Sequence, residues 1–290
     1  MGQFGELTLG GISFGMIYAA IGLALVLIWR ATRILNYAQG GMAMLTTYIA
    51  LTVISHTGSY WAGFAAALAA GLVLGAVIER VVIRPVENKP PLNAVIVTIG
   101  LLIFLEGLAG IIYGGQFRSF PAAFSITGLR QGSLGISSND VFVAGAVLAA
   151  ALILAVVFRY TSAGLRLRAS AFNAQVARLL GVRVGRMLTL GWALAGLIGA
   201  LAGVLVSPST FLYPDSMDSI FVLGFTAAVI GGLDSPAGAV AGGLVLGVVL
   251  NYVGGYLGAD LVPLFGLAAL TVVLMVRPSG LFAVTSTRQV

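Results

Sequence analysis

The stretch LTLGGISFGMIYAAIGLALVLIW, residues Leu7–Trp29, contains no charged side chain and only two hydroxyl residues that are not aromatic. A helix that crosses a lipid bilayer needs about 20 consecutive, predominantly apolar residues. The apolar residues of this stretch do not alternate with polar ones, which argues against a barrel strand. The stretch therefore predicts a membrane-spanning helix.

The rest of the chain repeats this pattern. Hydrophobic residues make up 59% of the 290 residues and charged residues 8%, whereas a soluble domain carries about 45–50% and about 25%. This composition excludes a soluble globule and a disordered chain. We predict an all-α, polytopic membrane helix bundle of about nine spans that forms one transmembrane domain over residues 1–290. The predicted spans are Leu7–Trp29, Ile34–Ile54, Trp61–Ile83, Leu92–Tyr113, Val141–Phe158, Met187–Val206, Ser219–Leu233, Ala237–Tyr256 and Leu261–Val276.

The basic residues predict the orientation. The chain has 15 Lys and Arg against 9 Asp and Glu, and basic residues concentrate in cytoplasmic loops. With nine crossings, an outer N-terminus and a cytoplasmic C-terminus, only Arg118 and Arg130 lie outside. If Ser219–Leu233 is re-entrant instead, Arg277 and Arg288 also move outside, so the count mildly favours nine crossings. Because the basic residues separate apolar runs, they indicate topology, and we expect no nucleic-acid partner.

Several kinds of chemistry are excluded by residue type. The chain has no Cys, and His56 is its only His, so it has neither a thiolate metal site nor a His-based catalytic triad. A phosphate-binding P-loop places a Lys after its glycines. The single Lys, Lys89, precedes Pro90 and Pro91 instead. We expect no catalytic residue, metal or cofactor on this chain, and any ATP-Mg must bind to partner subunits.

Two polar features interrupt the spans. The second span starts with Asn36-Tyr37-Ala38-Gln39-Gly40-Gly41, which predicts either local unwinding beside a water-filled path or a polar helix start at the interface. Glu106 lies near the middle of the fourth span, where an ionisable group should face the bundle interior. It can bind the ammonium group of a zwitterionic substrate, carry a proton, or hydrogen-bond to a neighbouring helix.

The basic connector Arg159–Arg186 is the most informative soluble segment. Its centre, Ser170–Leu180, predicts a short amphipathic helix, and Gly181 suits a helix stop. The helix either lies on anionic headgroups or docks into a groove on a cytoplasmic partner. The apolar residues that define its face are Phe172, Val176, Leu179 and Leu180.

Glycine is frequent, with 40 residues. Many glycines are four residues apart, which allows helices to approach closely in lipid and predicts either tight packing or a mobile helix interface. These pairs are Gly11/Gly15, Gly71/Gly75, Gly110/Gly114, Gly199/Gly203, Gly238/Gly242 and Gly243/Gly247.

Six sequence pieces, in order, resemble one family over nearly the whole length. The pieces are Ile34-Leu35-Asn36-Tyr37-Ala38-Gln39-Gly40, Glu79-Arg80-Val81-Val82-Ile83-Arg84-Pro85, Thr98-Ile99-Gly100-Leu101, Ala177-Arg178-Leu179-Leu180-Gly181-Val182, Gly231-Gly232-Leu233-Asp234-Ser235 with Gly238-Ala239, and Arg277-Pro278-Ser279-Gly280-Leu281-Phe282. With these pieces the chain resembles the LivH-type permease subunits of bacterial ABC importers for branched-chain amino acids.

The resemblance implies a permease in the bacterial cytoplasmic (inner) membrane. It further implies a second, related permease subunit, two cytoplasmic ATP-binding subunits, an extracytoplasmic substrate-binding protein and surrounding membrane lipid as partners. The residues expected to line the substrate pathway are Asn36, Gln39, Gly40, Thr98, Gly100 and Glu106. The residues expected to couple to an ATPase, in the connector 159–186, are Arg168, Phe172, Asn173, Val176, Arg178, Leu179, Leu180 and Gly181.

The functional hypothesis is import of branched-chain or other small amino acids by alternating access, driven by partner ATPases. A stand-alone secondary transporter or channel for a small polar solute such as urea or an amide is the alternative. That class predicts several paired charges within the membrane, and Glu106 is the one that lies well inside. A membrane scaffold without transport would not need the polar start of the second span.

Overall fold

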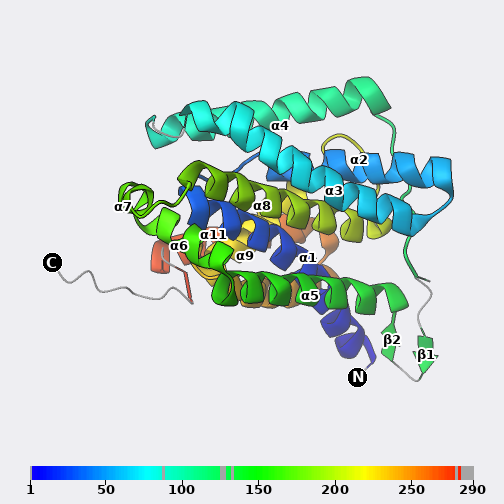
Figure 1. Ribbon diagram of the computed structural model, residues 1–290. Helices are drawn as coiled ribbons and strands as arrows, with labels where there is room; N and C mark the ends of the chain where they lie inside the picture. The colour runs from blue at the N-terminus through cyan, green and yellow to red at the C-terminus, as the bar shows by residue number, and fades with distance from the viewer. Residues whose placement is uncertain (1, 87–88, 125–128, 132–133, 278–279, 282–290) are drawn as a thin grey trace.

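A computed structural model describes residues 2–86, 89–124, 129–131, 134–277 and 280–281. In these residues the chain is almost entirely helical, with 11 α-helices and one short hairpin (Figure 1). This arrangement follows from the lipid solvent, in which each backbone N–H and C=O must be satisfied within the segment itself. The helices are α1 (Gly2–Thr32), α2 (Gln39–Thr57), α3 (Tyr60–Ile78), α4 (Pro91–Tyr113), α5 (Ser138–Tyr160), α6 (Ser162–Phe172), α7 (Ala174–Leu179), α8 (Val184–Val206), α9 (Asp218–Gly231), α10 (Pro236–Tyr256) and α11 (Val262–Val276).

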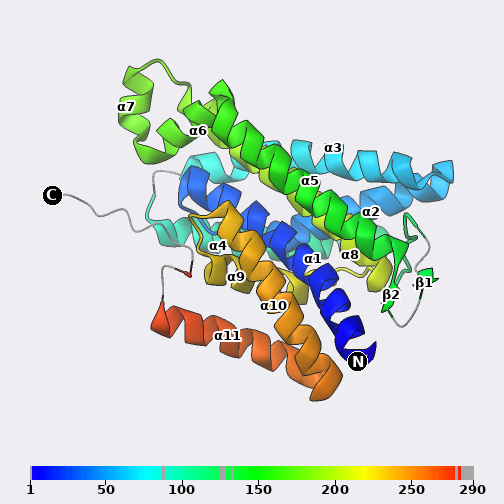
Figure 2. The same ribbon diagram turned by 90° about the horizontal axis from the view of Figure 1, so that it is seen from below.

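Helix α1 is the axis of the bundle. Its second half is buried on all sides, and it packs against α5, α8, α9 and α10. Figure 2 shows α5 on one side of α1 and α10 on the other. Helix α8 is the second buried helix and carries α3 on its outer side. Helices α4, α5 and α11 bury little of their surface and expose large apolar side chains, as surfaces that meet lipid or another subunit do.

Nine predicted spans correspond to nine helices, but the helices are not equivalent. Seven of them are long and apolar enough to cross a membrane. The other two are α2, which begins with polar residues, and α9, which has 14 residues. At ~1.5 Å per residue α9 is ~21 Å long, shorter than the ~30 Å hydrocarbon core. The prediction of about nine spans is therefore supported by length and composition for seven helices, and the crossing of α2 and α9 remains a prediction.

Close glycine contacts hold the buried helices together. A Cβ on Gly15 would lie 2.8 Å from the carbonyl oxygen of Gly243, and one on Gly247 would overlap the backbone of Gly15. Gly71 and Gly75 of α3 meet α8 in the same way. Five of the six predicted pairs are such contacts. The exception is Gly110/Gly114, where the nearest group to Gly110 is Pro214 at 4.0 Å and Gly114 has nothing within 4 Å.

The loop between α4 and α5 contains a short hairpin. Strands β1 (Leu129–Gln131) and β2 (Leu134–Ile136) pair antiparallel. Each strand has three residues, too few for an alternating pattern to be recognised in a sequence. Helix α10 is capped at its start, because the Ser235 hydroxyl accepts a hydrogen bond from the N–H of Gly238 and Pro236 occupies the first turn.

The glycine contacts lead to a test of stability. We expect Gly247→Ala to lower the free energy of unfolding by about 1–3 kcal/mol, because the new methyl group has no room against α1. Gly107→Ala is the matched control, since Gly107 also lies in a helix but has nothing within 4 Å of its Cβ position. Thermal unfolding of the purified proteins measures both. Equal effects of the two substitutions would contradict the packing argument.

Candidate functional site

The polar start of the second span is an irregular turn. Helix α2 begins only at Gln39, and both Asn36 and Gln39 are fully buried. The Asn36 amide donates to Gln39 Oε1 at 3.0 Å, and the Gln39 amide donates to the carbonyl of Ala195 in α8 at 3.0 Å. The N–H of Ala38 donates to Asn36 Oδ1 at 3.1 Å. The two amides thus replace the hydrogen bonds that the unwound backbone loses, and they tie the turn to α8.

Three further pathway candidates lie at different places. Thr98 of α4 is fully buried, and its hydroxyl donates to the carbonyl of Leu35 at 3.4 Å. Gly40 lies against Phe221 of α9, with 3.2 Å between its Cβ position and the Phe221 Cβ. The structure therefore gathers these two residues around the turn. Gly100, by contrast, lies on the exposed flank of α4 with nothing within 4 Å of its Cβ position.

Glu106 meets a partner that the sequence analysis missed. Its carboxyl group interacts electrostatically with those of Asp218, the first residue of α9, and Asp215. Glu106 Oε1 is buried and has no hydrogen-bond partner among the described residues. Glu106 is partly exposed in this single chain, and its placement in the interior of the assembled bundle remains a prediction.

The connector contains two helices where one was predicted. Helix α6 ends at Phe172 and α7 starts at Ala174. The Asn173 side chain caps α7 by accepting hydrogen bonds from the N–H groups of Gln175 and Val176, each at 3.0 Å. Gly181 has φ = 80° and follows α7, which confirms the predicted stop. The prediction of one continuous helix over Ser170–Leu180 was wrong, because Asn at this position competes for backbone hydrogen bonds.

The α6–α7 corner projects from the end of the bundle (Figure 2). Phe172 is 94% exposed and Leu179 is 87% exposed, and Leu180 and Val176 are exposed as well. We call these four side chains the apolar tip. The other face of α7 is anchored, since Ala177 is buried in a small cluster with Val184 and Leu188 of α8. Arg168 is separate from the tip and lines a groove beside α1 and α5.

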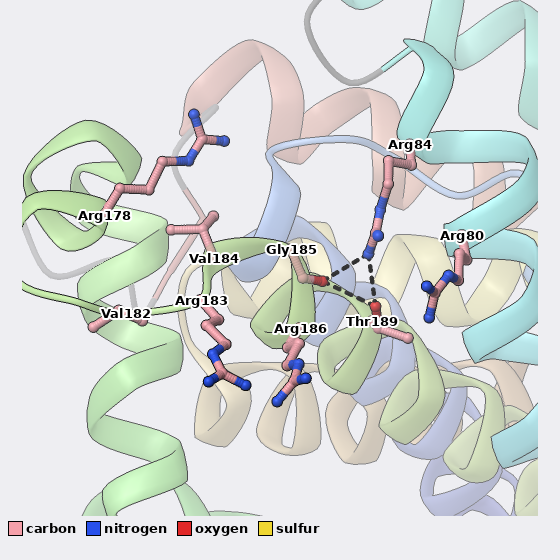
Figure 3. Close-up of a pocket in the computed structure, with 9 residues that line it drawn as sticks. All are labelled: Arg80, Arg84, Arg178, Val182, Arg183, Val184, Gly185, Arg186 and Thr189. Carbon is pink, nitrogen blue, oxygen red and sulfur yellow. Dashed lines mark hydrogen bonds between the residues drawn. The ribbon is translucent and has the colours of Figure 1, made fainter.

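A basic pocket of about 450 Å³ separates the connector from the end of α3 (Figure 3). Arg178, the remaining coupling candidate, lines this pocket together with Val182. The other arginines that line it are Arg80, Arg84, Arg183 and Arg186.

Arg84 links two elements at this pocket. It pairs with the buried Glu79 at 3.0 Å and also donates to the carbonyl of Gly185 at 2.8 Å and to the Thr189 hydroxyl at 2.9 Å. Residues Glu79–Ile83 form a π-helical turn, which brings side chains five residues apart onto one face. The sequence analysis assigned no role to this pair. The only sequence signal for it is the five-residue spacing of Glu79 and Arg84.

The pair leads to a second stability prediction. Arg84→Gln leaves the Glu79 carboxylate buried without a cation, so we expect the free energy of unfolding to fall by about 2 kcal/mol. This is less than the ~3–5 kcal/mol found for fully buried pairs, because the Arg84 side chain is 36% exposed. The control is Arg80→Gln. Arg80 is an exposed arginine close to Arg84 in the chain, and it forms no ion pair among the described residues. If both variants unfold at the same temperature in detergent, the link has no structural role.

Comparison with known proteins gives one consistent result. Residues 7–277 match the family described as "Branched-chain amino acid transport system / permease component". The chain is 29% identical over 287 residues to the high-affinity branched-chain amino acid transport system permease protein LivH of Salmonella typhimurium, covering 93% of this chain and 92% of that one. It is equally similar to LivH of Escherichia coli K12, over 289 residues, and 25% identical to BraD of Pseudomonas aeruginosa over 285 residues.

A solved structure supports the fold alone. PsaBC from Streptococcus pneumoniae in complex with Fab aligns with a TM-score of 0.53 at 15% identity, covering 94% of this chain and 91% of that one.

The family match confirms the predicted resemblance and the predicted role of a permease that is not itself the ATPase. Because that match covers most of the sequence, the chain belongs to the family of branched-chain amino acid transport permeases, which are multi-pass membrane proteins.

Proposed function

We propose that this chain is the membrane-spanning permease of an ATP-driven importer in the bacterial inner membrane. It moves branched-chain, or other small, amino acids into the cytoplasm by alternating access. The family match over residues 7–277 carries this proposal, and the printed names of the relatives support the substrate class. ATP-Mg binds to two partner subunits, a related permease completes the membrane part, and an extracytoplasmic binding protein delivers the substrate.

The proposed topology has nine crossings, with the N-terminus outside and the C-terminus in the cytoplasm. The Arg33–Asp234 ion pair, at 2.6 Å, supports it. Arg33 follows α1, and Asp234 lies between α9 and α10. If α9 were re-entrant, it would return to the side where α8 ends, and Asp234 would lie at the opposite end from Arg33. Arg277 thus lies inside; Arg288 falls outside the described residues.

The substrate pathway follows the polar turn and the flank of α4. Asn36, Gln39, Gly40 and Thr98 surround the turn, and Gly100 and Glu106 lie along the exposed side of α4. The exposed flank faces the second permease subunit in this proposal. Glu106, whose Oε1 has no hydrogen-bond partner among the described residues, binds the ammonium group of the substrate.

The apolar tip docks on a partner ATPase. Two large side chains there are almost completely exposed, while the opposite face of α7 is fixed to α8. An exposed apolar surface backed by a fixed face is typical of a helix that inserts into a groove on a partner. Asn173 shapes the corner and Gly181 ends it, while Arg168 and Arg178 line separate pockets and add positive charge to the same connector.

Glu106→Gln tests the pathway. We expect leucine uptake into vesicles to fall about tenfold or more, because a hydrogen bond to a charged group contributes roughly 1.5–3 kcal/mol. Glu6→Gln is the control, since Glu6 lies near the start of α1, far from α4. The same vesicles, tested with isoleucine, valine, urea and short amides, define the substrate. Unchanged leucine uptake with normal membrane levels would contradict the role of Glu106.

Phe172→Asp tests the docking surface. We expect the ATPase subunits to be lost from the purified complex and uptake to be abolished, because a charge at the tip cannot enter an apolar groove. Leu165→Asp is the matched control, since Leu165 is a 62% exposed apolar residue of the same helix α6 outside the tip. If Phe172→Asp retains its ATPases, the tip lies on lipid headgroups instead.

A further inference from the structure

An apolar groove of about 560 Å³ lies between α1, α5 and α10, apart from the tip and the polar turn. Its floor is formed by Leu23 and Leu27 of α1, and α5 forms one wall with exposed Leu148 and Leu152. The start of α10 forms the other wall, at Pro236 to Val240. In Figure 2 the two wall helices lie on opposite sides of α1. The exposed side chains of Leu148 and Leu152 show that the groove opens at the surface of the chain.

Three arginines close one end of this groove. Arg30 comes from α1, Arg159 from the end of α5 and Arg168 from α6. Within the described part of the chain, none of them forms an ion pair. The nearby carboxylate of Asp234 attracts the positive charge of Arg30, but it already forms an ion pair with Arg33. Three positive charges thus meet at this end of the groove, and they are not matched by an equal number of carboxylates.

The length of the groove matches one leaflet of a bilayer. The part of α5 that lines the groove extends over ten residues, from Leu148 to Phe158. At ~1.5 Å per residue this part is ~15 Å long. The hydrocarbon core of a bilayer is ~30 Å thick, so one leaflet is ~15 Å. The arginines come directly after this apolar length, at the level where headgroups lie.

We propose that this groove is a binding site for an anionic phospholipid. One acyl chain lies along Leu23, Leu27 and Leu152, and the headgroup phosphate binds the guanidinium groups of Arg30, Arg159 and Arg168. Basic pockets between transmembrane helices bind anionic headgroups, and guanidinium groups match phosphate oxygens in pairs. An apolar helix of another subunit in this groove would leave the three arginines without an anion, and a free phosphate would leave the apolar length empty.

Native mass spectrometry of the full chain, purified with the subunits that accompany it, tests the proposal. We expect phosphatidylglycerol to remain bound where phosphatidylcholine of the same acyl chains does not, and inorganic phosphate not to displace it. Arg30→Gln and Arg159→Gln each weaken the binding about fivefold, the effect of one basic residue near a charged headgroup. Lys89→Gln is the charge-matched control, because Lys89 is exposed and does not line the groove.

A second variant pair tests the apolar part. Ala155 lines the groove, so Ala155→Trp fills it and we expect the retained lipid to be lost. Ala149→Trp is the control on an exposed, non-lining position of α5. Equal retention of both lipids, or unchanged binding in the arginine variants, overturns the proposal. The proposal is also overturned if the Ala155→Trp variant keeps its bound lipid but loses the accompanying subunits. In that case the groove is an interface with another protein.

Discussion

Lipid supplies no hydrophobic force that drives one apolar helix against another, so this bundle depends on close backbone contact. That contact is densest along α1, where Gly15 meets Gly243 and Gly247 of α10. Because glycine has no side chain, the two backbones approach each other and gain dispersion contacts at these positions. The buried position of α1 follows, and α8, α9 and α5 then pack around a fixed axis. The helices farther out, such as α4 and α11, remain exposed to lipid or to other subunits.

Polar side chains inside this bundle fall into two kinds. Asn36 and Gln39 satisfy one another and the carbonyl of Ala195, and Arg84 satisfies Glu79. Both groups link separate helices and leave no buried charge unpaired, so each contributes to structural stability. Glu106 differs, because one of its oxygens is buried without a hydrogen-bond partner among the described residues, a condition it shares with single atoms of Trp29, Tyr48, Trp192 and Ser216. Glu106 is the only carboxyl group among these five residues, and for this reason the proposed substrate contact is placed on it.

The sequence was sufficient to predict what depends on local pattern. The nine helical segments and the stop at Gly181 follow from apolar length and from the conformational preferences of single residues. The break at Asn173 was missed because the apolar spacing continues through it, and only the capping hydrogen bonds reveal it. The contact of Glu106 with Asp218 was missed for a different reason. It joins two helices far apart in the chain, and no local pattern records which flanks of two helices meet.

The contacts of α8 suggest how the apolar tip and the polar turn communicate. Ala177 of α7 packs on the start of α8, Arg84 holds the same turn through Gly185, and farther along α8 the carbonyl of Ala195 receives the hydrogen bond of Gln39. A displacement of the tip therefore acts first on α8 and only then on the turn. Contiguity alone does not transmit energy, which requires elements with two discrete arrangements. Two elements without regular α-helical geometry adjoin this route: the π-helical turn that carries Glu79, and the irregular turn before α2. A second arrangement would break fewer α-helical hydrogen bonds in these turns than in the long helix α8 between them, so a switch in this permease is expected there.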